Sequence, residues 1–160
     1  TPVASEKKWA RFLEDQGVDI IMGCHPHVVQ PMELRNGART GRPMFLTYSH
    51  GNFISNMMTA DTRGGLMTRV TLSRDSLGQA YIKNARYRLI FTEPPTDGTF
   101  KPEPSRSDLP ASALYRFARE NYRVLNVDSV DGAYRDRARK FASTVRALFN
   151  RHNVGDILPE

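Results

Sequence analysis

The sequence has little cysteine, no long apolar run and no initiator methionine. Its single cysteine, Cys24, excludes an internal disulfide framework and gives no indication of an oxidising compartment. No run approaches the ~20 apolar residues that a membrane-spanning helix needs, and the polar start EKKW excludes a signal peptide there. Because the chain begins Thr1-Pro2, we expect it to be a piece of a longer protein, with any targeting or membrane segment outside these residues.

Acidic residues are also in the minority. The chain has 17 of them against 23 lysines and arginines, which gives a net charge of +6. This excess weakly favours a polyanionic partner, such as a phosphate ester, an acidic polymer, lipid headgroups or nucleic acid, although a solvated basic face is the simpler explanation. No nucleic-acid-binding motif or aromatic stacking platform is present, so we expect no nucleic-acid partner.

The composition, 39% hydrophobic and 25% charged, is that of a globular protein, and 160 residues can bury a substantial core. Residues 5–16 have the pattern of a helix, with Ser5 as N-cap and Gly17 placed to end it. Trp9, Phe12 and Leu13 fall on one face of this helix. The apolar run at 18–24 then predicts a buried strand, central in a sheet.

Three further segments predict strands. Residues 43–49 form a second apolar strand, reached through a turn at Asn36-Gly37 that is longer than a two-residue hairpin. Residues 66–74 alternate between apolar and polar positions, and a turn connects them to 80–91. This pattern predicts an antiparallel pair.

The last third of the chain changes character. Residues 93–110 hold five of the ten prolines and predict a linker. Helices are expected near 111–122 and 131–151, and the second has an apolar stripe surrounded by arginines. The stripe that we expect to be buried contains Tyr134, Ala138, Phe141, Val145 and Leu148. We therefore divide the chain into a domain at 1–92, the linker, and a helical appendage at 111–160 that packs on the same domain.

The stretch GCHPHVVQP, residues 23–31, carries the most informative chemistry. In an extended segment, residues two apart project to the same side, so His25 and His27 could present two imidazoles to one point. Pro26 restricts the backbone between them, and Gly23 allows close approach. Neutral imidazole binds zinc, iron, manganese or nickel. A loop that merely contains two histidines is the alternative.

The wider sequence around this motif resembles the CapA family, the poly-γ-glutamate capsule synthesis proteins of the calcineurin-like metallophosphoesterase superfamily. The resemblance covers about a third of the chain. The positions that match the family pattern are Gly17, Asp19, Gly23, His25, Pro26, His27, Gln30, Pro31, Pro43, Phe45, Ser49, Gly51, Asn52 and Phe53.

The resemblance implies an α/β fold, the C-terminal part of a metallophosphoesterase-like α/β/β/α sandwich with mixed sheets and C-terminal helices. It also implies a two-metal site in which His25 and His27 bind divalent ions (Mn, Zn, Fe or similar) that activate water for attack on phosphorus. The family's other ligands lie upstream and match nothing here. We therefore expect the longer protein to bind metal, and this chain alone to bind it weakly or not at all and to be inactive.

Three residues near the motif leave alternatives open. Cys24 is either a small buried residue or, less simply, a ligand. His50 replaces an apolar residue of the family pattern and is either an exposed loop histidine or an additional ligand or acid. Asn52 either takes part in the catalytic site with His25 and His27 or is a turn asparagine before Phe53.

Two functions follow from these expectations. The first is a capsule biosynthesis protein of the bacterial cell envelope whose metal-dependent hydrolase site acts on a phosphoester or an anionic polymer. The second is a non-catalytic, polymer-binding scaffold on the same fold. If half of the sandwich is absent, a strand with an open edge would also favour a homodimer.

Overall fold

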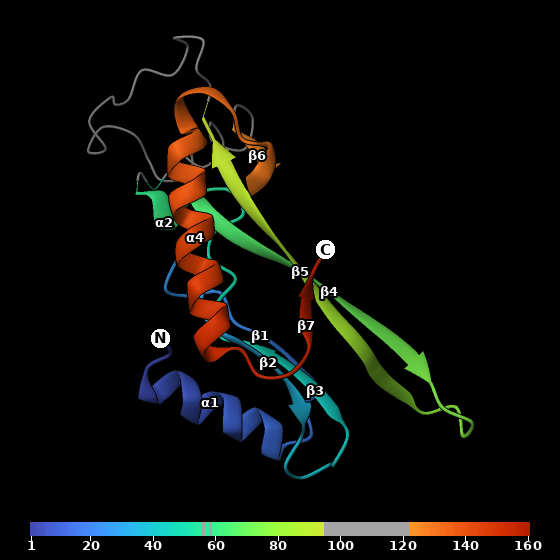
Figure 1. The fold of residues 1–160 in the computed structure, drawn as a ribbon. Coiled ribbons are helices and arrows are strands. Elements are labelled where there is room, and N and C mark those ends of the chain that lie inside the picture. The colour runs from blue at the N-terminus through green and yellow to red at the C-terminus, as the bar shows by residue number, and fades with distance from the viewer. Residues whose placement is uncertain (56, 58, 95–121) are drawn as a thin grey trace.

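A computed structural model of the chain describes residues 1–55, 57, 59–94 and 122–160. These residues form a mixed α/β fold with two sheets and a long C-terminal helix, which confirms the expected fold class (Figure 1). The elements are α1 Ala4–Asp15, β1 Ile20–Met22, β2 Met32–Asn36, β3 Pro43–Thr47, α2 Ala60–Arg63, β4 Gly64–Arg74, β5 Ala80–Glu93, β6 Arg123–Asn126, the 3-10 turns η1 Val127–Ser129 and η2 Gly132–Tyr134, α4 Arg135–His152 and β7 Ile157–Pro159.

The first helix lies where the sequence predicted it, but its cap and its packed face differ. Val3, not Ser5, is the N-cap, because the Glu6 carboxylate accepts a hydrogen bond from the Val3 N–H at 2.7 Å. The side chains of Trp9 and Phe12 are 65% and 50% exposed. The apolar residues of α1 therefore point largely away from the sheet.

A buried carboxylate fixes α1 to β2. Glu14 is buried and receives two hydrogen bonds from Arg35, at 2.7 and 2.8 Å, and one from the Ala38 N–H at 2.7 Å. The Arg35 hydrogen bond is the main reason that the pKa of Glu14 falls to about 2, although burial opposes it. Glu14 is therefore ionised at neutral pH and joins the helix to the sheet.

The first sheet is mixed and has the strand order β1-β3-β2. β1 runs parallel to β3, and β2 runs antiparallel to it. The strand expected at 18–24 is thus only three residues long. It lies at an edge of the sheet, not at the centre as predicted, and its residue Met22 is 59% exposed. Among the described residues its outer edge has no strand partner, so a homodimer through this edge stays a prediction.

The second sheet is built on the long β4–β5 hairpin, which confirms the antiparallel pair expected at 66–74 and 80–91. β6 pairs antiparallel and β7 parallel with β5. The part of the hairpin near its turn projects away from the rest of the fold (Figure 1).

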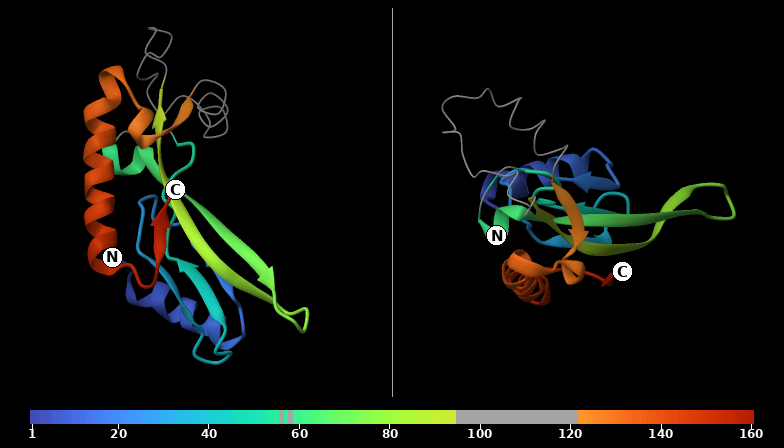
Figure 2. Two further views of the ribbon diagram at one scale, coloured as in Figure 1. Left: turned by 45° about the vertical axis from the view of Figure 1, so that its right-hand side comes forward. Right: turned by 90° about the horizontal axis from the view of Figure 1, so that it is seen from above.

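The core lies between the two sheets and α4. Phe45 of β3 and Phe91 of β5 meet Phe141 and Val145 of α4 in one buried cluster. Met44 and Leu46 point to the other face of β3, toward Ala10 of α1. The two helices therefore lie on opposite sides of the strands (Figure 2).

The C-terminal helix largely agrees with its prediction. It begins at Arg135, after the two 3-10 turns, four residues later than expected. Phe141 and Val145 are buried, whereas Tyr134 and Leu148 are only half-buried. The arginines of α4 are exposed, as expected.

The linker beyond Pro94 and the helix expected at 111–122 fall outside the described residues, apart from Tyr122, which is buried and not helical. The division into a domain, a linker and an appendage stays a prediction. None of the helices in the described part of the chain is long and apolar enough to cross a membrane.

Candidate functional site

The loop with the two histidines, residues 23–31 between β1 and β2, is called the histidine loop. It begins against the end of β3. The Gly23 N–H donates to the Thr47 carbonyl at 2.8 Å, and the Gly23 carbonyl accepts from the His50 N–H at 3.1 Å. A Cβ at position 23 would lie 2.1 Å from the Tyr48 carbonyl oxygen. The residue must therefore be glycine for β1 and the segment after β3 to approach this closely.

His25 and His27 follow β1 directly, and both side chains are exposed. Their rings contact each other with centroids 5.2 Å apart. The expected extended geometry is wrong, because His27 has a φ of 70°, in the left-handed region. A turn, not the alternation of a strand, brings the two imidazoles together.

Asn52 fixes the tautomer of neutral His27. The side chain of Asn52 is buried, and its Nδ2 donates to the Thr62 carbonyl at 2.8 Å. Its Oδ1 must then be the acceptor that lies 2.8 Å from His27 Nδ1. In neutral His27 the proton is thus on Nδ1, and Nε2 keeps a lone pair that can bind a metal.

The segment that carries Asn52 is held between the two sheets. After β3, His50 forms a bridge with Val29 and Gly51 forms one with Gly65 of β4. Gly51 has a φ of +68°, which favours glycine, and this conformation turns the chain toward the histidine loop. The sequence placed Asn52 near the site only through the family resemblance, because no local pattern predicts a contact across 25 residues.

His50 differs from both sequence interpretations, because it is half-buried and both ring nitrogens have partners. Nδ1 lies 3.2 Å from the Gly23 carbonyl, to which it donates, and Nε2 lies 3.0 Å from the Thr68 hydroxyl. Burial lowers the pKa of His50 below its usual 6.5, although the hydrogen bond to Gly23 opposes this. Neutral His50 therefore braces the base of the histidine loop against β4.

This contact predicts a loss of stability in mild acid. The folded protein binds the His50 proton less tightly than the unfolded chain does. Neutral His50 therefore adds to the free energy of unfolding above pH 6.5, and this contribution is lost as the pH falls through the pKa that His50 has in the folded protein. Chemical denaturation should show that the free energy of unfolding decreases between pH 7.5 and pH 5. The decrease should be smaller in His50→Gln. An equal decrease in both proteins would contradict the role of His50.

Cys24 is exposed, so the interpretation of this residue as a small buried side chain is wrong. Across residues 1–55, 57, 59–94 and 122–160, no three His, Cys, Asp or Glu side chains gather where they could hold a metal ion. The described residues thus provide a pair of imidazoles, which is fewer than the four ligands typical of a zinc site.

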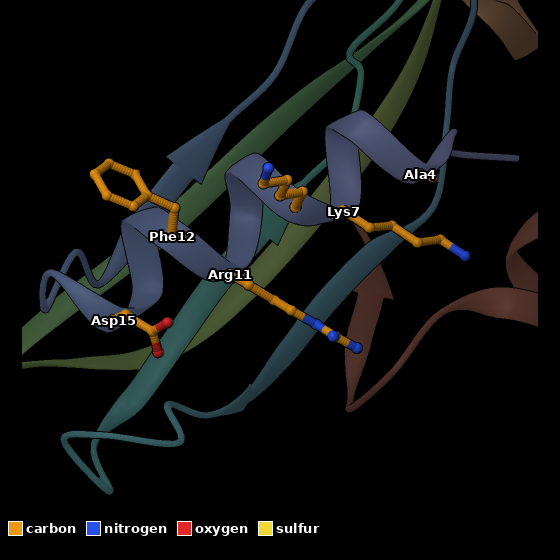
Figure 3. A pocket seen from close by; sticks show the side chains of 6 residues that line it. Ala4, Lys7, Arg11, Phe12 and Asp15 are labelled. Atoms are coloured by element: carbon orange, nitrogen blue, oxygen red, sulfur yellow. The ribbon is translucent and has the colours of Figure 1, made fainter.

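A separate hollow of about 500 Å³ lies on the outer face of α1. Figure 3 shows Lys7 and Arg11 extending on one side of the helix and Phe12 on the other, with Asp15 near the end of the helix. Lys8 completes the charged lining, which therefore has three cations and one carboxylate. Such a surface attracts anions. The charged side chains are exposed, so each one alone adds little to the attraction.

Comparisons with known proteins agree with the motif. Residues 1–57 match the sequence model of a family described as bacterial capsule synthesis protein PGA_cap. A protein of Bacillus subtilis (strain 168) named "PGA biosynthesis protein CapA" is 33% identical over 78 residues. That alignment covers 49% of this chain and 19% of the relative, so the chain matches only about a fifth of that protein. No solved structure matches.

Proposed function

Since the chain belongs to the CapA family of bacterial capsule synthesis proteins, we propose that His25 and His27 contribute two ligands to a metal-dependent site of the phosphoesterase type. A capsule biosynthesis family is associated with the cell envelope, and we place the site there. The observation that carries the proposal is the hydrogen bond from His27 Nδ1 to Asn52.

The arrangement around the two imidazoles supports metal binding. A ligating histidine usually donates its second ring N–H to an oxygen, which sets the tautomer and orients the ring. Asn52 provides this oxygen, and its own amide is held by Thr62. The exposed position of both rings leaves them accessible to an ion and to further ligands.

A divalent cation, when bound, supplies Lewis-acid chemistry to a phosphoryl group. The residues of this chain hold and orient its ligands. Asn52 keeps the proton of His27 on Nδ1, and Gly23 and His50 hold the loop against β3 and β4. We expect the remaining ligands to come from other parts of a longer protein, so this chain by itself should bind metal weakly.

The partner that we propose is an anionic polymer or a phosphoester. The net charge of +6 and the three cations around the hollow on α1 support this choice. Binding to such a polymer should weaken as salt is added, because exposed charges are screened.

A second candidate function is a scaffold that binds the polymer without turnover, which the three cations around the hollow on α1 favour. Hydrolysis of a phosphodiester such as bis-p-nitrophenyl phosphate by the complete gene product, with added Mn²⁺, separates the two. If the protein is an enzyme, turnover should be lost in His27→Ala and kept in His152→Ala. Binding of metal and polymer without turnover would support the scaffold instead.

Replacing Asn52 by alanine should lower the metal affinity of the complete gene product by about 10- to 100-fold. The variant leaves both imidazoles in place but removes the oxygen that fixes the tautomer of His27. Isothermal titration calorimetry measures the change, and Asn36→Ala, at an exposed position, serves as the control. Equal affinities for wild type and Asn52→Ala would contradict the orienting role.

A further inference from the structure

One face of the β4–β5 hairpin, which projects from the fold in Figure 1, carries three arginines. The register places Arg69 of β4 directly opposite Arg86 of β5. Arg88, two residues further along β5, is on the same face, opposite Met67. All four side chains are exposed. The other face of β5 packs on α4 through the ring of Tyr87. The three arginines, called the arginine ladder, therefore lie on the side of the hairpin away from α4.

The pairing of Arg69 with Arg86 creates a repulsion that an anion would relieve. Directly opposite residues of an antiparallel pair have Cβ atoms about 5 Å apart, and like charges in this arrangement destabilise the sheet. In the part of the chain that the structure describes, Arg86 has no ion pair or hydrogen bond that would offset the repulsion. A neutral residue at either position would avoid this cost, so the pair of cations points to a ligand of opposite charge.

A carboxylate of the chain itself shows how the arginine ladder holds an acid. The two side-chain oxygens of Glu160 form ion pairs with Arg69 and with Arg88, the latter at 3.3 Å. One carboxylate thus fits between arginines of the two strands. The side chains of Arg69 and Arg88 are still 65% and 47% exposed, and ion pairs at such exposure contribute little to stability. A carboxylate from another molecule can therefore replace Glu160, and a second one can bind beside it at Arg86.

The spacing of the arginines along β5 favours an extended peptide as the source of these carboxylates. Residues two apart in a strand are about 6.6–6.8 Å apart and share a face, as Arg86 and Arg88 do. An extended peptide with acidic residues at alternate positions presents its carboxylates at the same interval. Each carboxylate can make a bidentate contact with a guanidinium. The exposed thioether of Met67, opposite Arg88, offers an apolar contact to the carbon chain of a glutamate.

We propose that the arginine ladder is a docking surface for an extended acidic segment of another protein, with glutamate or aspartate at alternate positions. One carboxylate binds between Arg69 and Arg86, and the next binds Arg88 in place of Glu160. The net charge of +6 assists the approach of such a segment. The surface uses no residue of the histidine loop, and the proposal does not depend on metal binding there.

The test is a titration of the complete gene product, at low salt, with three pentapeptides acetylated and amidated at their ends. Ser-Glu-Ser-Glu-Ser has the alternate spacing. Ser-Glu-Glu-Ser-Ser has the same charge, but its neighbouring carboxylates point to opposite sides of an extended chain, and Ser-Gln-Ser-Gln-Ser has no charge. We expect saturable, millimolar binding of the first peptide, binding of the second that is weaker by about fivefold, and no binding of the third. Equal affinities for the first two, or no saturation at about 20 mM of the first, would overturn the proposal.

Variants locate the surface. Arg86→Gln removes a guanidinium that has no partner among the described residues, so it should leave the melting temperature unchanged and weaken binding of Ser-Glu-Ser-Glu-Ser by about fivefold. Arg139→Gln, at an exposed position of α4, is the control and should bind this peptide as the wild type does. Equal weakening by both variants would indicate general charge attraction and contradict the surface. Inorganic tripolyphosphate that binds as tightly as the peptide and competes with it would overturn the assignment to an acidic peptide.

Discussion

Replacing Phe141 by alanine should lower the free energy of unfolding by about 3–5 kcal/mol. The Phe141 ring is 1% exposed and lies 6.1 Å from the Phe91 ring, centroid to centroid, in the cluster that joins α4 to both sheets. Its edge fits against Gly64, where an added Cβ would lie 2.3 Å from the ring. Truncation therefore removes contacts with two elements and leaves a cavity that the backbone cannot easily close.

Chemical denaturation with a linear extrapolation measures the change. Phe12→Ala is the matched control, because this ring is 50% exposed and its loss should cost less than about 1 kcal/mol. A loss below about 1 kcal/mol for Phe141→Ala as well would show that α4 is peripheral and that its apolar face serves another contact.

Replacing Gly23 by alanine should destabilise the fold by about 2 kcal/mol or more and displace the histidine loop. The new Cβ would lie 2.1 Å from the Tyr48 carbonyl oxygen and 3.1 Å from that of Thr47. Both atoms belong to the backbone, so a change of side-chain rotamer cannot relieve the contact. The bond from the Gly23 N–H to Thr47 would lengthen, and the rings of His25 and His27 would move with the loop.

Ring-proton NMR signals of the histidines follow this displacement. Gly78→Ala is the control, because a Cβ there meets nothing within 4 Å and costs only the strain of its positive φ, roughly 1–2 kcal/mol. The His25 and His27 signals should shift in Gly23→Ala and stay in place in Gly78→Ala. Unchanged signals in Gly23→Ala would show that the loop does not depend on this close contact.

The strongly periodic segments were predictable from the sequence. The alternation over 66–74 and the turn that leads to 80–91 predicted the hairpin, because one face of an alternating strand meets the core. The spacing of Ala138, Phe141 and Val145 gave the helix α4 in the same way. Both patterns repeat over many residues and depend on the helix or strand itself rather than on a distant partner.

The short strands were not predictable. β6 and β7 have four and three residues and no alternation, and they form only because β5 offers them an edge. The apolar run at 18–24 indicated a central strand, but the same hydrophobicity also fits an edge strand covered on one face by a helix. Pairing partners distant in sequence decide between these cases.

At the site, the sequence indicated the two histidines but not the contacts that organise them. The i, i+2 rule assumed an extended backbone, whereas His27 adopts a positive φ. The bond between Asn52 and His27 follows the turn at Gly51, and the brace from His50 to Gly23 joins residues 27 positions apart. Only the tertiary structure reveals either contact.

The most direct test is calorimetric titration of Mn²⁺ into the complete gene product, with His27→Ala and His152→Ala as the variants. His152 is an exposed histidine at the end of α4 and corrects for nonspecific binding to imidazole. If His25 and His27 hold the ion, wild type and His152→Ala will bind Mn²⁺ with the same affinity, and His27→Ala will lose that binding. Binding of equal strength in His27→Ala, or no binding by the wild type, would contradict the metal site.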